Sequence, residues 1–255
     1  MAVLHYLEKM IPTYYTLPEN IGEAELTILG EEAHHISRVM RLKRGEAVIV
    51  VDGMGNGYKS EIMEISAREV TCSIYSRIRN FGEPLHRVTL SAGLSTGVKF
   101  DDVIQRATEL GVTRFIPLVT EKSKVRIDEE MKGQKKLDRW RKVAIASIKQ
   151  CGRSLIPAIE PLIEFERIFT DYADLGHKLL LDPGGNRRIE NLSFGSEERD
   201  ISLLIGPESG FTRSEVESAR EKGAEIITLG GRILRTENAG PTAVALLMNL
   251  LGEFR

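Results

Sequence analysis

Apolar and polar positions follow two different patterns in the two parts of this chain. Up to about residue 80, apolar residues alternate with polar ones or gather in short β-branched runs, a pattern typical of strands. The strands that we expect are Ala47–Asp52, Tyr58–Ile65 and Val70–Ile78. Glycines 53, 55 and 57 between the first two predict a hairpin turn. One helical stretch, Glu31–Arg41, interrupts this β-rich part.

From Arg87 onward, short apolar runs alternate with helical segments. The expected strands are Val88–Leu94, Phe115–Val119, Lys178–Leu181, Ile201–Ile205 and Glu225–Leu229. The expected helices are Phe100–Leu110, Gln134–Gln150, Phe165–Tyr172, Arg213–Lys222 and Thr242–Leu251. This alternation favours a parallel α/β sheet. The sequence therefore predicts a β-rich domain over residues 1–80, a Gly- and Pro-containing linker over 81–86, and an α/β domain over 87–255.

The last two apolar runs each end in a glycine-containing loop that leads into a helix. Runs of this kind are typical of strands buried on both faces of a parallel sheet, where ligands bind beyond the carboxyl ends of the strands. The loops Gly206–Phe211 and Leu229–Gly240 are therefore predicted to form two walls of one pocket. The second loop carries adjacent Ile233 and Leu234, which suit a flat aromatic ligand such as adenine.

Composition narrows the class of protein without naming a function. Of the 255 residues, 42% are hydrophobic and 28% are charged, which is ordinary for a globular protein, and no apolar run approaches the length of a membrane span. The N-terminal residues do not have the layout of a signal peptide. Cys72 and Cys151 make neither a disulfide framework nor a metal cluster, so we expect no metal and a reduced, cytoplasmic compartment. With a net charge of −2, any surface that binds RNA phosphates must be local.

Two basic groups are candidates for such a surface. Arg38, Arg41, Lys43 and Arg44 follow the early helical stretch, and the residues alone leave a solvated helix end and an RNA contact equally open. Arg153 follows a second basic run over residues 132–142, most of which we interpret as a solvated helix face.

Other motifs do not carry their familiar chemistry. The segment 93–99 lacks the glycine spacing of a phosphate-binding loop, and Ser209 lies in GPESG rather than in the GxSxG of a hydrolase elbow. The adjacent His34 and His35 point about 100° apart on a helix and do not form a metal-binding pair.

Four segments in order carry a resemblance to a known family. They are EEAHHISRVMRLKRGE (31–46), KFDDVIQRATELGVTRFIPLVTEKS (99–123), RWRKVAIASIKQCGRSLIP (139–157) and GPESGF with LGGRILRTENA (206–239). Together they resemble the RsmE family, the 16S rRNA (uracil(1498)-N3)-methyltransferases of the SPOUT superfamily. The chain departs from the family at Ser209, where glycine is usual, and at Asn238, where threonine is usual.

The resemblance implies a fold, a cofactor and partners. The fold would be a SPOUT-type parallel sheet with a C-terminal trefoil knot, preceded by a small PUA-like β-barrel that binds RNA. The basic residues Arg38, Arg41, Lys43, Arg44 and Arg153 then become RNA-binding candidates. The cofactor would be S-adenosylmethionine, the substrate 16S rRNA of the small ribosomal subunit, and the assembly a homodimer without a membrane partner.

The expected cofactor residues come from three strand ends. They are Leu181, Asp182, Gly184, Ile205, Gly206, Pro207, Glu208, Gly210, Leu229, Gly230, Ile233, Leu234 and Ala239. Arg232, Arg235 and Glu237 are the charged residues of the second loop and our catalytic hypothesis. An arginine would stabilise the uracil oxygens, and Glu237 would orient an arginine or accept the N3 proton.

Three alternatives remain at this stage. The first is another SPOUT methyltransferase acting on tRNA or a different rRNA position, which Asn238 favours slightly. The second is a noncatalytic RNA-binding protein. The third is an α/β hydrolase, which the missing nucleophile elbow and the absence of any histidine after His177 disfavour.

Overall fold

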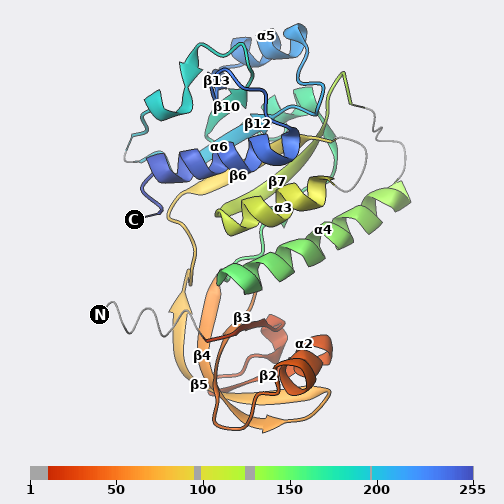
Figure 1. The fold of residues 1–255 in the computed structure, drawn as a ribbon, viewed down its shortest axis with the longest axis vertical. Coiled ribbons are helices and arrows are strands. Elements are labelled where there is room, and N and C mark those ends of the chain that lie inside the picture. The colour runs from red at the N-terminus through yellow and green to blue at the C-terminus, as the bar shows by residue number, and fades with distance from the viewer. Residues whose placement is uncertain (1–10, 95–98, 124–129, 196, 255) are drawn as a thin grey trace. The chain divides into compact units, whose positions relative to one another are not determined.

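The computed structural model describes residues 11–94, 99–123, 130–195 and 197–254, and the chain forms two compact units. The first unit contains residues 1–83 together with 145–156, and the second contains 84–144 together with 157–255. Figure 1 shows a β-rich first unit and a second unit in which helices cover a sheet. In the described part of the chain, no helix is both long enough and apolar enough to cross a membrane.

The first unit is built on a five-stranded sheet. Its strands are β1 (Thr13–Tyr15), β2 (Glu25–Leu29), β3 (Ala47–Val51), β4 (Asn56–Ile65) and β5 (Glu69–Arg79), in the order β1-β3-β4-β5-β2. The β1–β3 pair is parallel and the remaining pairs are antiparallel. The predicted strands are confirmed, whereas β1 and β2 were not predicted. Residues 52–55 form the tight connection between β3 and β4, as the glycine-rich sequence indicates.

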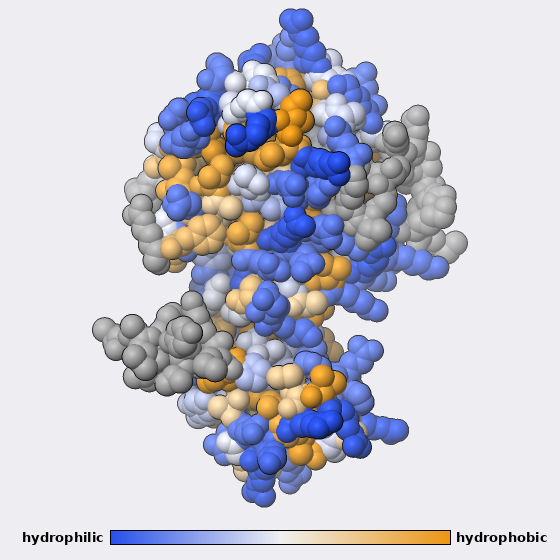
Figure 2. Space-filling model, in the orientation of Figure 1, coloured by the Kyte–Doolittle hydropathy of each residue, from blue (hydrophilic) through white to orange (hydrophobic). Residues whose placement is uncertain are grey.

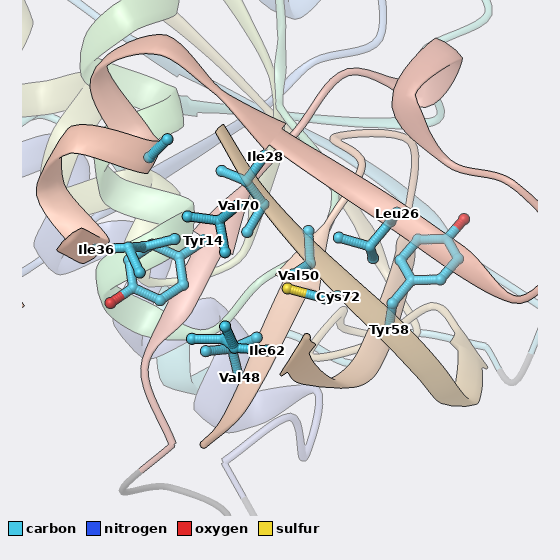
Figure 3. Packing of buried hydrophobic residues seen from close by; sticks show 11 residues of the cluster. Tyr14, Leu26, Ile28, Ile36, Val48, Val50, Tyr58, Ile62, Val70 and Cys72 are labelled. Atoms are coloured by element: carbon cyan, nitrogen blue, oxygen red, sulfur yellow. The ribbon is translucent and has the colours of Figure 1, made fainter. Parts of the chain in front are cut away.

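One face of this sheet holds an apolar core (Figure 3). Leu26, Ile28, Val50 and Ile62 each expose 1% or less of their surface there. Burial raises the pKa of the Cys72 thiol to about 12, so this cysteine stays protonated and acts as a small apolar side chain.

The helical stretch over the sheet is less regular than predicted. The α-helix α2 (Gly30–His34) continues as the π-helical segment η2 (His35–Met40), and the chain leaves it at Arg41, whose φ is 54°. Ala33 and Ile36 are buried and belong to the same apolar core. The position of the predicted helix is confirmed, but its last turn is wider than an α-helical turn, and π-helical turns occur frequently at functional sites.

The second unit is built on an eight-stranded parallel sheet. Its strands are β6 (Arg87–Gly93), β7 (Val112–Val119), β8 (Ala158–Ile159), β9 (Ile163–Glu164), β10 (His177–Leu181), β11 (Arg187–Arg188), β12 (Asp200–Ile205) and β13 (Glu225–Thr228). The order is β11-β13-β10-β12-β6-β7-β8, and β9 also pairs with β7. The five longer strands were predicted. The two-residue strands β8, β9 and β11 are too short to leave a periodic signal.

Helices cover this sheet. They are α3 (Lys99–Glu109), α4 (Glu130–Cys151), α5 (Arg213–Glu221) and α6 (Thr236–Leu250), with 3-10 turns η3 (Phe165–Phe169) and η4 (Ile189–Asn191); a further turn, η1 (Pro18–Asn20), lies in the first unit. Helices α3 and α6 pack against each other (Figure 1). The boundary between the two units falls within α4, after Ala144. The capping box of Thr212 and Glu215 starts α5, as predicted.

Two predicted helices differ from the structure. Phe165–Tyr172 is only the short 3-10 turn η3, which Phe165 and Ile168 anchor in the core. Helix α6 begins at Thr236 rather than at Thr242, with Pro241 inside it. Proline usually marks a helix boundary because it has no N–H to donate and its ring clashes with the carbonyl four residues earlier. Here residues 239–241 are all buried, so tertiary packing outweighs that local cost.

Candidate active site

A cavity of about 240 Å³ opens at the carboxyl ends of β10, β12 and β13 in the second unit. Its lining consists of Leu181, Asp182, Pro183, Ile205, Gly206, Pro207, Glu208, Ser209, Gly210, Thr228, Leu229, Gly230, Arg232, Ile233, Leu234, Thr236 and Ala239. All of the predicted cofactor residues lie in this lining except Gly184. The two glycine loops therefore form one pocket, as the strand-end argument predicted.

The first wall is the loop Gly206–Phe211 after β12. A Cβ atom added at Gly206 would lie 3.0 Å from the backbone nitrogen of Phe211, and Gly210 has a φ of 68°. The backbone N–H of Gly210 donates to the carbonyl of Pro207 at 2.8 Å, which closes a tight turn. Glycine suits both positions, because a Cβ would crowd the loop backbone at the first and a side chain would strain the backbone at the second.

The second wall is the loop from Leu229 into the first turn of α6. Gly230 has a φ of 103°, and its N–H donates to the Thr228 hydroxyl at 3.2 Å. Ile233 is 86% exposed although it lines the cavity, so an apolar surface stands open to a ligand at the pocket. The Thr236 hydroxyl donates to the carbonyl of Gly206 at 3.4 Å, which joins the second wall directly to the first.

The third side of the pocket comes from the end of β10. The Asp182 backbone N–H donates to Ile227 at 3.0 Å, and one Asp182 carboxylate oxygen accepts from the Gly184 N–H at 2.8 Å. Gly184 itself is exposed and does not line the cavity, because the turn carries it outward. The lining also contains Pro183, Ser209, Thr228 and Thr236, which were not among the named cofactor residues. Ser209 and Thr236 belong to the two predicted loops, and Pro183 and Thr228 are chain neighbours of named residues.

The three catalytic candidates do not share one position. Arg232 is exposed and lines the cavity, whereas Arg235 is the exposed N-cap residue of α6. Glu237 lies half-buried in the first turn of α6, and neither Arg235 nor Glu237 lines the cavity. The Oε2 atom of Glu237 is buried and has no hydrogen-bond partner among the described residues. A buried carboxylate oxygen without a donor is costly, so this atom calls for an explanation.

Asn238, the other unusual residue of this helix turn, has a packing partner. Its side-chain oxygen accepts a hydrogen bond from the Arg106 guanidinium of α3 at 3.0 Å. The asparagine therefore helps to hold α6 against α3, and this role does not involve the pocket.

The RNA candidates of the first unit fall into two groups. The four residues that we call the basic cluster (Arg38, Arg41, Lys43 and Arg44) are all exposed at the end of η2. Arg153 is different, because only 4% of its side chain is exposed and it pairs with Glu83 at 2.6 Å. Arg153 therefore offers no exposed charge to an RNA phosphate in the described structure, and we interpret it as a structural residue.

Among the described residues, no group of three or more His, Cys, Asp or Glu side chains is arranged to hold a metal ion. The pocket chemistry consists instead of glycine backbone, an open apolar surface, the carboxylates of Asp182 and Glu208, and one arginine.

Comparison with known families defines the class. Residues 82–248 match the family described as RNA methyltransferase domain, and residues 28–75 match the RNA methyltransferase PUA domain. The parallel sheet with its pocket and the preceding β unit thus form an α/β RNA methyltransferase with an N-terminal PUA domain.

Individual relatives narrow the class further. Ribosomal RNA small subunit methyltransferase E of Bacillus subtilis is 33% identical over 228 residues, which is 87% of this chain and 89% of that protein. The protein of the same name from Synechocystis is 30% identical and covers 92% of this chain and 76% of its own length. The chain belongs to the ribosomal RNA small subunit methyltransferase E family.

Solved structures agree with this placement. Ribosomal RNA small subunit methyltransferase E of Neisseria gonorrhoeae, bound to S-adenosyl methionine, superposes with a TM-score of 0.84 at 27% identity, covering 94% of this chain and 98% of that one. A putative methyltransferase of Legionella pneumophila in complex with the same cofactor gives a TM-score of 0.81 at 28% identity, covering 94% and 97%.

Proposed function

We propose that this protein transfers the methyl group of S-adenosylmethionine to N3 of a uracil in 16S ribosomal RNA. The observation that carries the proposal is the joining of two glycine-bent loops around one open cavity at the carboxyl edge of the sheet. The relatives that share this fold carry the name of a small-subunit ribosomal RNA methyltransferase, and two structural neighbours are bound to S-adenosyl methionine or SAM.

The residues of the pocket fit this cofactor. Ile233 and Leu234 offer an apolar surface for the adenine ring, and the glycine loops expose backbone groups to it. The carboxylates of Asp182 and Glu208 can accept hydrogen bonds from the hydroxyl groups of S-adenosylmethionine and can attract its positive charge. When bound, the cofactor supplies an already activated methyl group in the form of a sulfonium.

The protein must then hold the uracil in line and assist the loss of its N3 proton. Orienting two reactants is worth about 7–11 kcal/mol, so the rigid walls of the pocket supply much of the acceleration. Arg232 lies at the cavity, where its guanidinium stabilises the developing charge on the uracil oxygens. Glu237 lies in the first turn of α6 beside the second wall, and its Oε2 lacks a donor in the described structure. Its carboxylate is our candidate either to orient an arginine or to accept the N3 proton.

RNA recognition falls to the first unit. We assign residues 1–80 as the RNA-binding domain and 87–255 as the catalytic domain, with 81–86 as the linker. The exposed basic cluster supplies the local positive charge that a chain of net charge −2 needs to hold phosphates. A uracil within ribosomal RNA reaches the pocket only when it is unstacked, so gripping the flanking RNA is part of catalysis.

The assembly that we propose is a homodimer, with the C-terminal region threaded as a trefoil knot. Large apolar side chains are exposed at Leu246 on α6 (42%) and Phe254 (55%) near the end of the chain. Leu85, whose N–H donates to the Glu253 carboxylate, is 75% exposed. Figure 2 shows apolar residues gathered beside charged ones on one face of the second unit. Exposed apolar patches of this kind mark protein–protein contacts.

A deletion strain tests the proposal. Mass spectrometry of its 16S rRNA should lack one 3-methyluridine that re-expression of the wild-type protein restores. Loss of a tRNA modification instead would place the protein among the other RNA methyltransferases. A protein that binds no S-adenosylmethionine would be a noncatalytic RNA-binding protein.

A further inference from the structure

The turn that follows β7, Thr120–Ser123, contacts the first wall of the pocket from outside. The Lys122 ammonium donates to two carbonyls of that wall, Ser209 at 3.2 Å and Phe211 at 3.0 Å. In return, the Ser209 hydroxyl donates to the Lys122 carbonyl at 3.4 Å. These contacts run between segments almost ninety positions apart in sequence, so they fix one strand-end loop relative to another.

A buried carboxylate makes a second tether at the same place. Glu215 is only 7% exposed, and its Oε2 accepts from the backbone N–H of Thr212 at 2.7 Å as part of the capping box. Its other oxygen, Oε1, accepts from the backbone N–H of Glu121 at 2.8 Å. One side chain therefore caps α5 and holds the turn after β7 against the helix that follows the pocket loop.

The turn that makes these contacts is itself closed. The Thr120 N–H donates to the Ser123 hydroxyl at 3.0 Å, and the Ser123 N–H donates to the Thr120 carbonyl at 3.0 Å. It therefore offers a fixed support rather than a loose strand of chain.

The first wall needs such support. It contains Gly206 and Gly210, residues that lose more conformational freedom on ordering than any other type. The last residue of the loop, Phe211, is buried, and the centroid of its ring lies 5.2 Å from that of Phe165. Its middle, including the pocket-lining Ser209, is held from outside by Lys122.

We propose that Lys122 and Glu215 are positioning residues that keep the Gly206–Phe211 loop in the conformation that binds the methyl donor. Neither residue lines the cavity, so both act through the loop rather than on the ligand. The inference rests on the proposed function of the pocket. It predicts that the two tethers govern the affinity for S-adenosylmethionine and leave the methyl-transfer step at saturating cofactor nearly unchanged, because preorganising a loop lowers the cost of binding.

The test compares variants of the full-length protein. Lys122→Met keeps the aliphatic stem and removes the ammonium, and Lys122→Arg restores a charged donor. Arg213→Ala is the matched control, since it breaks an exposed pair with Glu217 on the same helix α5 and Arg213 does not line the cavity. Each is titrated with S-adenosylmethionine by calorimetry, and kcat and KM for the cofactor are measured on small ribosomal subunits that lack the modification.

Lys122→Met should raise both Kd and KM for the cofactor about five- to twenty-fold, the effect of losing charge-assisted bonds, with kcat within about twofold of wild type. Lys122→Arg should recover most of the affinity, and Arg213→Ala should match wild type. Glu215→Gln keeps the size and shape of the side chain but removes its charge. It should raise Kd and KM for the cofactor as Lys122→Met does. Because Lys122 is exposed, its substitution tests the proposal even if Glu215→Gln does not fold.

The outcomes separate two failures. Wild-type affinity in Lys122→Met, or a loss of kcat without a change in KM, would overturn the positioning role. If Lys122→Met lowers the melting temperature but leaves the cofactor affinity unchanged, the Lys122 contacts stabilise the fold and do not position the loop for the cofactor. A wild-type protein that binds no S-adenosylmethionine would instead overturn the proposed function itself.

Discussion

Gly93, the last residue of β6, lies directly against Pro207 of the pocket loop. A Cβ atom at position 93 would fall 2.5 Å from both the ring Cδ and the nitrogen of Pro207. Real Cβ contacts are never so short, so the neighbouring strand has to end in glycine for the loop to take this path. The sheet itself thus sets the position of the first wall.

We therefore expect Gly93→Ala to displace Pro207 and to weaken S-adenosylmethionine binding by about tenfold or more, since a pocket-wall shift of a fraction of an ångström affects every contact in it. Calorimetric titration measures this. Gly133→Ala serves as the control, because a Cβ there meets no atom within 4 Å. Equal affinity in the two variants would mean that the Gly93–Pro207 contact does not shape the pocket.

The exposed apolar side chain at the pocket gives a second prediction. Ile233→Asp should leave the fold intact, because the side chain is 86% exposed. It should lower cofactor affinity about tenfold by removing roughly 1.5 kcal/mol of apolar contact with the adenine ring. Met54→Asp, at an equally apolar residue that is 68% exposed in the first unit, is the control and should bind as wild type.

Substitution of the charged residues should separate binding from chemistry. Arg232→Ala and Glu237→Gln are expected to bind S-adenosylmethionine within a few-fold of wild type, yet to lower single-turnover methyl transfer about 10²-fold or more, the usual contribution of a positioned acid–base group. Rapid quench with labelled cofactor measures the rate. If both variants methylate at the wild-type rate, these residues are not catalytic.

The basic cluster should act on RNA alone. Replacing Arg38, Lys43 and Arg44 together by alanine should weaken binding of 16S rRNA fragments and reduce the salt dependence of log K by about 0.7–0.9 per lost phosphate contact. Cofactor affinity should not change. Lys136→Ala, on an exposed face of α4, is the control and should keep the wild-type slope. An unchanged slope in the triple variant would move the RNA surface elsewhere.

The buried Arg153–Glu83 pair should affect stability rather than RNA binding. The two side chains are only 4% and 7% exposed, and the Glu83 carboxylate also accepts from the backbone N–H groups of Ser154 and Leu155 at 2.8 Å each. Arg153→Met leaves that carboxylate buried without its cation. We therefore expect the free energy of unfolding to fall by about 3–5 kcal/mol. Chemical denaturation checks this. Arg167→Met, which breaks an exposed pair with Asp171, should cost far less.

The sequence predicted the pocket because its signals are local. Glycine after a buried apolar run means a strand end in a parallel sheet, and strand ends meet at one edge, so Ile205, Gly206 and Leu229 were placed together correctly. The capping box of Thr212 was equally local. Gly184 lies outside the lining for a similarly local reason, because the turn that Asp182 forms two residues earlier carries it away from the cavity.

The parts that were missed depend on long-range packing. The burial of Arg153 follows from Glu83, seventy positions earlier, and no periodicity reveals that partner. The early start of α6 follows from the packing of Gly240 over Leu90 and Val103, which outweighs the ordinary effect of Pro241. The Lys122 tether likewise joins two strand ends that only the folded sheet brings together.

One measurement tests the central claim most directly. Small ribosomal subunits lacking the modification are incubated with the purified protein and S-adenosylmethionine, and the 16S rRNA is digested and analysed by nucleoside mass spectrometry. We predict one new 3-methyluridine per subunit, formed about five-fold more slowly or worse by Gly93→Ala protein at a cofactor concentration near the wild-type Kd, as tenfold weaker binding requires. Methylation at a ribose hydroxyl or another base, or none with active wild-type protein, would contradict the account.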